Sequence, residues 1–189
     1  MKPKSVPNDL DSTARILAHM VSEQYDEAII ELNEVIKLVP NNASAYALRG
    51  DAHLKNGQYD EALNDFNEAI KLDPNDAMFY SGRVDAYVMK SQFDDATREL
   101  GEVIRLEPNN ADAYKRRGNL YGAQGQFDAA ISDFTKAIKL DPNDANIYSA
   151  RGTAYYGNGQ EKQAIQDYEK ALSLDPKIEG VRQALEKLQ

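Results

Sequence analysis

The chain has 189 residues, a net charge of −9 and no cysteine. Without cysteine it cannot form disulfides, thiolate metal sites or a cysteine nucleophile. Its acidity argues against a nucleic-acid partner, because a phosphate backbone is bound through clustered lysine and arginine. No apolar run of about 18 residues and no leader-like amino terminus is present, which predicts a soluble, cytoplasmic protein without membrane insertion, although an export leader could have been removed.

Residues 1–8 contain two lysines, two prolines and no apolar pattern, which predicts a flexible arm. Prolines then recur at intervals of 34 residues, at Pro40, Pro74, Pro108, Pro142 and Pro176. A fixed period of this length, with a proline near the end of each unit, predicts stacked helical hairpins. The expected units are 9–42, 43–76, 77–110, 111–144 and 145–178, and positions are counted from 1 to 34 in each.

Each unit carries the signals of two helices joined by a short turn. The last four units follow Asn42, Asp76, Asn110 and Asp144, whose side chains can cap a first helix. A turn then follows, as at Gly57 and Gly125, where glycine allows a positive φ at the helix end. The proline near the unit's end stops the second helix by disfavouring helical geometry at the residue before it.

Residues 179–189 lie outside the period and are expected to form a carboxy-terminal capping helix. Val181, Leu185 and Leu188 share one helical face, while Arg182 and Glu186 do not. Helical arrays need such a terminal element, because it covers the last apolar surface and presents a polar one to water.

The residues that repeat most faithfully are small or aromatic. The fourth unit carries them at positions 4, 8, 11, 20, 24, 27 and 32, as Tyr114, Gly118, Tyr121, Ala130, Phe134, Ala137 and Pro142. This pattern resembles the tetratricopeptide repeat (TPR) family. The resemblance implies an all-α, right-handed α-solenoid, or superhelix, of five helix-turn-helix units and a cap, with eleven helices. The first unit departs from the pattern, for example at Ile16 and Leu32, and is interpreted as a degenerate repeat.

Two further positions repeat without belonging to that pattern. Position 7 is arginine in every unit, at Arg15, Arg49, Arg83, Arg117 and Arg151, and position 23 is acidic, at Glu31, Asp65, Glu99, Asp133 and Asp167. An antiparallel hairpin brings these positions side by side, and an arginine fork matches a carboxylate. We favour a ladder of ion pairs between helices. The alternative is a row of arginines lining a groove for an anionic ligand.

The sequence predicts no catalytic, cofactor or metal site. It has no glycine-rich phosphate loop after a strand, and no serine has a histidine placed as its base. His19 and His53 both occupy position 11, where later units have tyrosine, which indicates a packing role. The family's carboxylate clamp is incomplete: Lys115 and Asn119 match it, but Ala150 stands at the next required position.

The resemblance implies that the first helices line a concave face, with positions 2, 5, 6, 9, 12 and 13 directed inward. The expected peptide-binding residues there are Leu48, Asp51, Leu54, Met78, Asp85, Val88, Met89, Lys115, Arg116, Asn119 and Tyr156. Asp51 and Asp85 would select basic ligand residues, and Lys115 with Arg116 acidic ones. The expected function is a non-catalytic protein-binding scaffold or adaptor that takes an extended peptide or a partner helix.

The net negative charge decreases along the repeats, with values of −5, −4, −2, 0 and 0 from the first unit to the fifth. This gradient favours a partner with a basic segment near the amino-terminal units, although surface acid that only maintains solubility would give the same gradient. Two alternative functions stay open. The chain could be a structural protein that self-associates as a homo-oligomer, or the TPR fragment of a larger enzyme or of a secretion or assembly complex.

Overall fold

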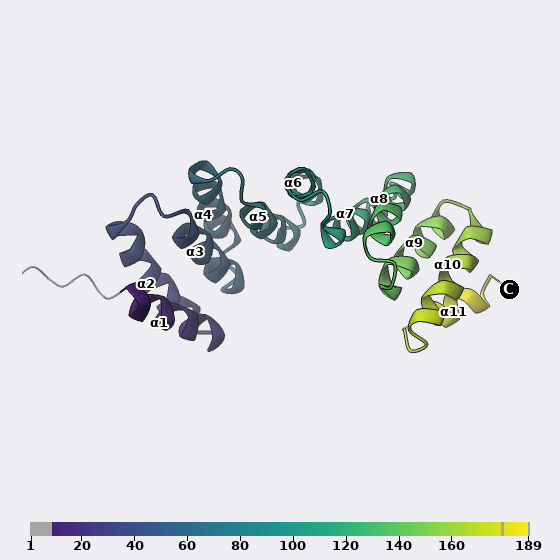
Figure 1. The fold of residues 1–189 in the computed structure, drawn as a ribbon, viewed down its shortest axis with the longest axis horizontal. Helices are drawn as coiled ribbons and strands as arrows, with labels where there is room; N and C mark the ends of the chain where they lie inside the picture. Colours follow the sequence, from purple (N-terminus) through teal and green to yellow (C-terminus); the bar gives the residue numbers. More distant parts are fainter. Residues whose placement is uncertain (1–8, 179, 189) are drawn as a thin grey trace, which may run out of the picture. The chain divides into compact units, whose positions relative to one another are not determined.

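The computed structural model describes residues 9–178 and 180–188, and within them the only regular secondary structure is helix (Figure 1). The arm predicted for residues 1–8 lies outside the described residues. Eleven helices are present in the described part of the chain, as expected. They are α1 Asp9–Val21, α2 Tyr25–Leu38, α3 Ala43–Lys55, α4 Tyr59–Leu72, α5 Ala77–Met89, α6 Phe93–Leu106, α7 Ala111–Ala123, α8 Phe127–Leu140, α9 Ala145–Gly157, α10 Glu161–Leu174 and α11 Val181–Glu186.

The helices begin and end at the same positions of every 34-residue period. The first helix of each pair covers positions 1–13 and the second covers positions 17–30. The predicted amino-terminal caps form: Asn42 Oδ1 accepts from the Ala45 amide at 3.0 Å, and Asp144 Oδ1 accepts from the Asn146 amide at 2.8 Å. Asp76 and Asn110 cap α5 and α7 in the same way. These caps satisfy amides that a helix start leaves without partners.

The turn inside each pair depends on one left-handed residue at position 15. Gly57, Gly125 and Gly159 have φ angles of 77°, 72° and 74° there, as the sequence predicts for the first two. Glu23 and Ser91 occupy the same position with φ of 58°. Because a side chain disfavours this conformation, the register of the hairpin imposes it in those two units.

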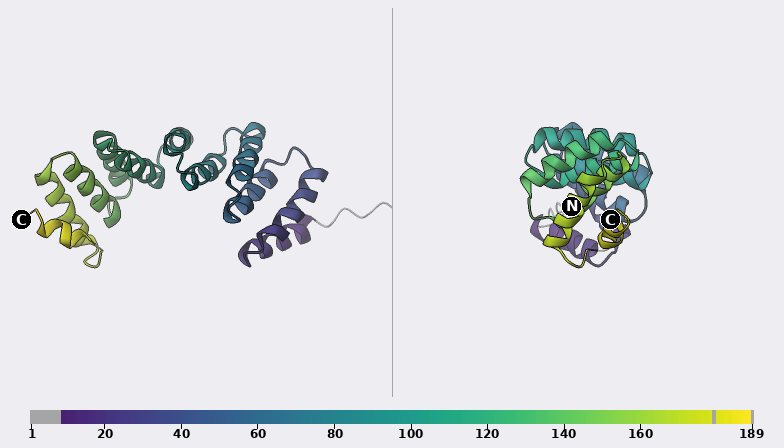
Figure 2. Two further views of the ribbon diagram at one scale, coloured as in Figure 1. Left: turned by 180° about the vertical axis from the view of Figure 1, so that it is seen from behind. Right: turned by 90° about the vertical axis from the view of Figure 1, so that its right-hand side faces the viewer.

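The chain divides into two compact units, one ending at Glu99 and the other beginning at Leu100, so that the division falls within α6. In the first unit, each helix from α1 to α5 packs against the next, and α3 also touches α5. In the second unit, α7 to α11 pack in the same sequential way, and α7 also touches α9. Figure 2 shows these helix pairs within each unit from two further directions.

Small residues allow the helices to approach closely. The alanines at position 20 have no exposed surface in any repeat: Ala28, Ala62, Ala96, Ala130 and Ala164. At position 8, a side chain on Gly50 would stand 3.1 Å from the Phe66 ring, and one on Gly118 would stand 2.8 Å from Phe134. Glycine at position 8 therefore makes room for the aromatic ring at position 24.

The first repeat solves the same packing problem with other residues. It has Ile16 at position 8 and Leu32 at position 24, and both lie in one buried cluster with Ile36 and Ala45. A smaller aliphatic residue at position 24 leaves space for a larger one at position 8. The departure of this repeat from the family pattern is thus an exchange of volume between two facing positions.

The last helix covers the end of the array. Val181 is buried against Tyr168 and Ala171, and Leu185 and Leu188 pack on the same cluster. These are the three residues that the sequence places on one face. The helix itself is shorter than expected, because it covers only Val181–Glu186.

Candidate functional site

The predicted ladder of ion pairs is present in all five repeats. The distances are 3.0 Å between Arg15 and Glu31, 2.6 Å between Arg49 and Asp65, and 2.7 Å for both Arg117–Asp133 and Arg151–Asp167. In the third repeat Arg83 binds Glu99, with Nε at 3.1 Å. The carboxylates of the last four repeats are buried.

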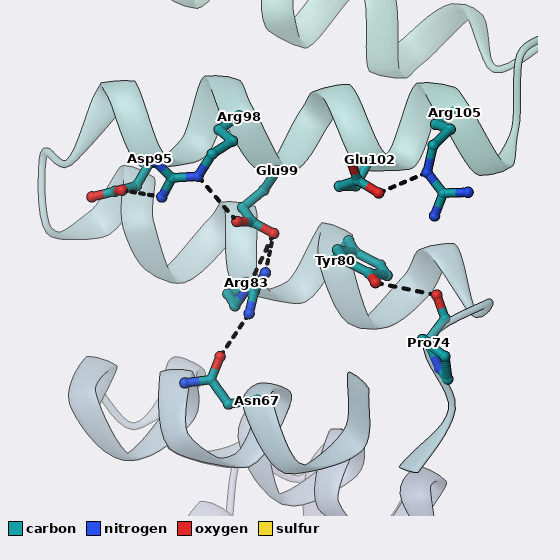
Figure 3. Close-up of polar contacts among 9 residues, drawn as sticks. All are labelled: Asn67, Pro74, Tyr80, Arg83, Asp95, Arg98, Glu99, Glu102 and Arg105. Carbon is teal, nitrogen blue, oxygen red and sulfur yellow. Dashed lines mark hydrogen bonds and ion pairs between the residues drawn. The ribbon is translucent and has the colours of Figure 1, made fainter. Parts of the chain in front are cut away.

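The same arginines also connect one repeat to the one before it. Arg49 Nη1 donates to Asn33 Oδ1 at 2.6 Å, and Arg151 Nη1 donates to Thr135 Oγ1 at 3.0 Å. Figure 3 shows Arg83 of α5 placed between Glu99 of α6 and Asn67 of α4, to which it donates at 2.7 Å. Position 7 therefore joins both helices of its own repeat to the second helix of the preceding repeat.

Gly101 interrupts this second set of bonds. It occupies position 25, where the bonds just described have asparagine or threonine, and so offers Arg117 no side-chain oxygen. A Cβ built on Gly101 would lie 3.8 Å from Arg117 Nη1, which is ordinary contact distance. A larger residue at this position therefore has room.

A further set of contacts between repeats lies at the hairpin turns and was not predicted. Asn56 donates to Asp26 Oδ1 at 2.8 Å, and Asn158 donates to Asp128 Oδ1 at 2.7 Å. Lys90 binds Asp60 in the same manner. Each contact joins position 14 of one repeat to position 18 of the repeat before it, so its partners are 30 residues apart. Comparing positions within one repeat does not reveal such pairs, because the partners belong to different repeats.

These contacts decide between the two interpretations of the arginine ladder. The guanidinium groups of Arg49, Arg117 and Arg151 have raised pKa values, chiefly because each is hydrogen-bonded to its acidic partner. Each also lies over a tyrosine at position 4, at distances such as 5.5 Å from Arg49 to the Tyr46 ring. The arginines are structural, as predicted, and do not form a row that opens onto a groove.

The expected binding residues of the first compact unit lie on α3 and α5, at positions that the resemblance assigns to the concave face. Asp51 and Asp85 both occupy position 9 and interact electrostatically. Burial raises the pKa of Asp51 to about 6, the negative charge of Asp85 adds to the rise, and Lys55 opposes it. At neutral pH the pair still presents negative charge, held on a partly dehydrated surface.

The apolar members of this set separate into two groups. Leu48 and Leu54 are half-buried and pack against core clusters, Leu48 beside Ile16 and Leu54 beside Phe66. Met78 and Met89 are exposed, Met78 by 74%, and Val88 is half-buried. The methionines are therefore the apolar side chains that could contact a ligand without disturbing the core.

The first repeat has two exposed apolar residues at equivalent positions that the sequence analysis did not name. Leu17 and Val21 occupy positions 9 and 13 of α1, and both are exposed. Treating the degenerate repeat like the others would have identified them, because they stand at the same inward positions as Asp51 and Lys55.

The expected binding residues of the second compact unit lie on α7 and α9. The Lys115 ammonium is 3.2 Å from Asp112 and 3.4 Å from Asp144, so two carboxylates already engage it. Although partial burial opposes the change, hydrogen bonds to Asp112 and the charges of both aspartates raise the pKa of Lys115. Arg116 is half-buried, while Asn119 and Tyr156 are exposed.

The two histidines fill the places of tyrosines in the packing, as the sequence indicates. His19 Nδ1 lies 2.9 Å from Gln24 Oε1, and His53 Nδ1 lies 2.6 Å from Gln58 Oε1. The other ring nitrogen of His53 is 3.7 Å from Asp65. Within the residues described, no group of three or more histidine or carboxylate side chains is arranged to hold a metal ion.

Sequence profiles identify the family to which these hairpins belong. The TPR repeat profile matches residues 18–57, 85–125 and 118–159, and the tetratricopeptide repeat profile matches residues 43–76 and 145–178. The chain belongs to the tetratricopeptide repeat family. The resemblance carried by the repeated alanines, aromatic residues and prolines is thereby confirmed, and the fold is an all-α TPR solenoid. A search of curated proteins gave no match.

Solved TPR structures resemble this one over most of its length. A MamA crystal structure is 28% identical, covers 85% of this chain and 94% of its own, and has a TM-score of 0.79. MamA from Desulfovibrio magneticus RS-1 is 22% identical, with coverages of 89% and 96% and a TM-score of 0.80. YrrB, a TPR protein with an unusual peptide-binding site, is 20% identical, with coverages of 90% and 88% and a TM-score of 0.79.

Membership in the TPR family establishes the general role of the chain. TPR arrays are generally non-catalytic interaction modules, and the family and fold of this chain are those of a protein-interaction scaffold. None of its described helices combines the length and apolar character needed to cross a membrane.

Proposed function

We propose that this TPR protein is a non-catalytic adaptor whose first helices bind an extended peptide or a partner helix carrying basic residues. The observation that carries the proposal is the pair formed by Asp51 and Asp85 on α3 and α5. The two carboxylates occupy position 9 of neighbouring repeats, and the negative charge of Asp85 adds to the cost of ionising Asp51. A lysine or arginine from a partner would relieve that cost.

The cost of keeping Asp51 ionised supports a binding role. A carboxylate whose pKa is raised by burial and by a like charge opposes folding at neutral pH. Perturbed groups of this kind gather at functional sites, where binding and not stability determines the residue.

Exposed methionines next to this pair provide the apolar part of the surface. Met78 lies at the start of α5 and Met89 at its end, and both are accessible to a ligand. Methionine adapts its shape to different partners through three rotatable bonds and a polarizable sulfur. A surface of this composition suits an extended segment that alternates basic and apolar side chains. YrrB, which has the same fold, is itself a peptide-binding TPR protein.

The test is a peptide selection on the intact chain. Peptides displayed on phage are selected against the wild-type protein, and the strongest are measured by fluorescence anisotropy. We expect enrichment of lysine and arginine, an affinity that falls with added salt, and a large loss of binding in the double variant Asp51→Asn/Asp85→Asn.

A control with the same change of net charge distinguishes binding at a specific site from general electrostatic attraction by the acidic chain. Glu27→Gln/Glu61→Gln removes two exposed acids from α2 and α4 and should retain most of the affinity. Equal binding by wild type and the aspartate variant would contradict the proposed surface. An equal loss in both variants would mean that net charge alone attracts the peptide.

A further inference from the structure

A second candidate site lies in the other compact unit, where the capping helix meets the last repeat. A half-enclosed cavity of about 220 Å³ separates α11 from the last hairpin. Typical small-molecule sites measure about 300–1,000 Å³, so this cavity is closer in size to one amino-acid side chain. It is lined by Tyr156, Tyr168, Gly180, Gln183, Ala184, Lys187 and Leu188.

The cavity has a feature that the equivalent positions of earlier repeats lack. Tyr168 occupies position 24, where the second and fourth repeats have Phe66 and Phe134. Its side chain is only 3% exposed, and its hydroxyl lies 3.3 Å from Thr153 Oγ1 on α9. A buried tyrosine hydroxyl needs a polar partner, and here that partner lies at inward position 9 of α9.

The rest of the lining combines apolar walls with one positive charge. Tyr156 is 53% exposed, while Ala184 and Leu188 are half-buried beside it. Lys187 is the one lining residue with a formal charge at neutral pH, and no ion pair joins it to a carboxylate within the described residues. Arg182 and Glu186, the charged residues of α11 itself, do not line the cavity.

The neighbouring face of α9 adds no negative charge. Its inward positions carry Asn146, Ser149, Thr153 and Tyr156, in contrast to the aspartates on α3 and α5. An anionic group that approached along α9 would meet Lys187 without passing a carboxylate at those positions. Charge complementarity therefore favours an acidic ligand here.

We propose that this cavity binds an apolar side chain, such as leucine, that stands next to a glutamate or aspartate within a partner segment. The apolar side chain lies between Tyr156 and Leu188, and the adjacent carboxylate accepts hydrogen bonds from Lys187 and Gln183. The inference rests on the proposed function only in that the partner is a peptide. It assigns a separate contact with the opposite charge preference.

Three capped dipeptides test the chemistry directly: acetyl-Leu-Glu-amide, acetyl-Leu-Gln-amide and acetyl-Gly-Glu-amide. Each is titrated into the intact ¹⁵N-labelled chain, and the amide signals of Gln183, Ala184 and Lys187 are followed by NMR. We expect saturable shifts with Leu-Glu. Binding should be about two- to five-fold weaker with Leu-Gln, because one exposed charge contact is lost. It should be about ten-fold weaker or more with Gly-Glu, because no apolar side chain is buried.

Variants locate the site. Lys187→Gln should reduce Leu-Glu affinity to that of Leu-Gln, while Lys177→Gln, on an exposed loop residue with the same charge change, should leave it unaltered. Ala184→Leu fills the cavity and should abolish the shifts. If that variant does not fold, the lysine variants alone decide the question. The absence of shifts with Leu-Glu, or equal affinities for Leu-Glu and Leu-Gln, would overturn the proposal.

This outcome is independent of the surface on α3 and α5. Asp51→Asn/Asp85→Asn should bind the Leu-Glu dipeptide as wild type does. Failure of the basic-peptide proposal and failure of this one are therefore observed in different variants and with different probes.

Discussion

Ionisation of the Asp51 side chain destabilises the folded state. Its pKa lies near 6 instead of its ordinary value of 3.8, mainly because burial disfavours the charged form. Between those two values the native state binds more protons than the unfolded state, so stability falls as pH rises through this window. At neutral pH the cost is on the order of 2–3 kcal/mol.

Asp51→Asn should therefore raise the free energy of unfolding at pH 7 and change it little below about pH 3, where the carboxyl group is mostly protonated in both states. The sequence alone suggests no effect on stability, because Asp51 lies outside the repeated packing positions. Urea unfolding of wild type and variant at several pH values measures the difference. Glu61→Gln, an exposed acid on α4, is the control. A difference that does not depend on pH would mean that ionisation of Asp51 is not its cause.

Positions 8 and 24 exchange volume between repeats, and this exchange can be tested in the fourth repeat. Gly118→Val places atoms against the Phe134 ring, where even a Cβ would be at 2.8 Å, and should cost about 1–3 kcal/mol. Phe134→Leu alone leaves a cavity and should also destabilise. The double variant places two aliphatic residues at these positions, as Ile16 and Leu32 do in the first repeat, and should recover much of the loss.

Thermal or urea unfolding of the four proteins gives the coupling energy between the two positions. Additive losses would show that the exchange seen in the first repeat depends on its other residues. Two repeats have a residue other than glycine at position 8, namely Ile16 and Val84. In both, leucine replaces the aromatic residue 16 positions later, at position 24. The sequence does not show that the side chains at positions 8 and 24 touch, and therefore it does not explain why these two positions change together.

Helices and turns were predictable because their signals are local. Capping residues, the position-15 turn and the proline each act within a few residues, and the register that they define matches the observed helices. The contacts between repeats were not predictable in the same way. Asn33 and Asn67 resemble ordinary polar surface residues until the structure places the next repeat's arginine beside them. The proposed binding surface was harder still to predict, because its residues vary from repeat to repeat.

Gly101 offers a test of the bonds that link successive repeats. Helix propensity alone makes Gly101→Ala more stable than Gly101→Asn by about 0.5 kcal/mol, and it makes either variant more stable than the wild type with glycine. Asparagine can also accept a hydrogen bond from Arg117, as Asn33 and Asn67 do from their arginines, and such a bond to a charged group contributes about 1.5–3 kcal/mol. We expect the asparagine variant to be the more stable of the two.

Urea unfolding of wild type and both variants checks this order. If alanine gives the more stable protein, as propensity predicts, Arg117 does not form the bond and the ladder between repeats contributes little to stability. A loss of stability in both variants would instead mean that the backbone at Gly101 needs glycine, although ordinary contact distance separates its Cβ position from Arg117.

Charge is distributed unequally between the two compact units. Residues 9–99 carry 18 acidic and 8 basic side chains, whereas residues 100–189 carry 13 acidic and 12 basic ones. Excess charge of one sign destabilises a folded unit through self-repulsion, and salt relieves it by shortening the range of exposed charges from about 30 Å at 0.01 M to about 8 Å at 0.15 M. Buried pairs of the ladder are screened much less.

Adding salt over this range should therefore stabilise the first unit more than the second. Repeat arrays need not unfold in one step, because each repeat interacts mainly with its neighbours. Hydrogen exchange measured by mass spectrometry can follow α3 and α4 separately from α8 and α9. Protection of α3 and α4 should rise clearly with salt, and that of α8 and α9 should change little. Glu27→Gln/Glu61→Gln, which removes two charges from the first unit, should reduce its response. An equal response of both pairs of helices would show that the charge difference between the units does not control their stability.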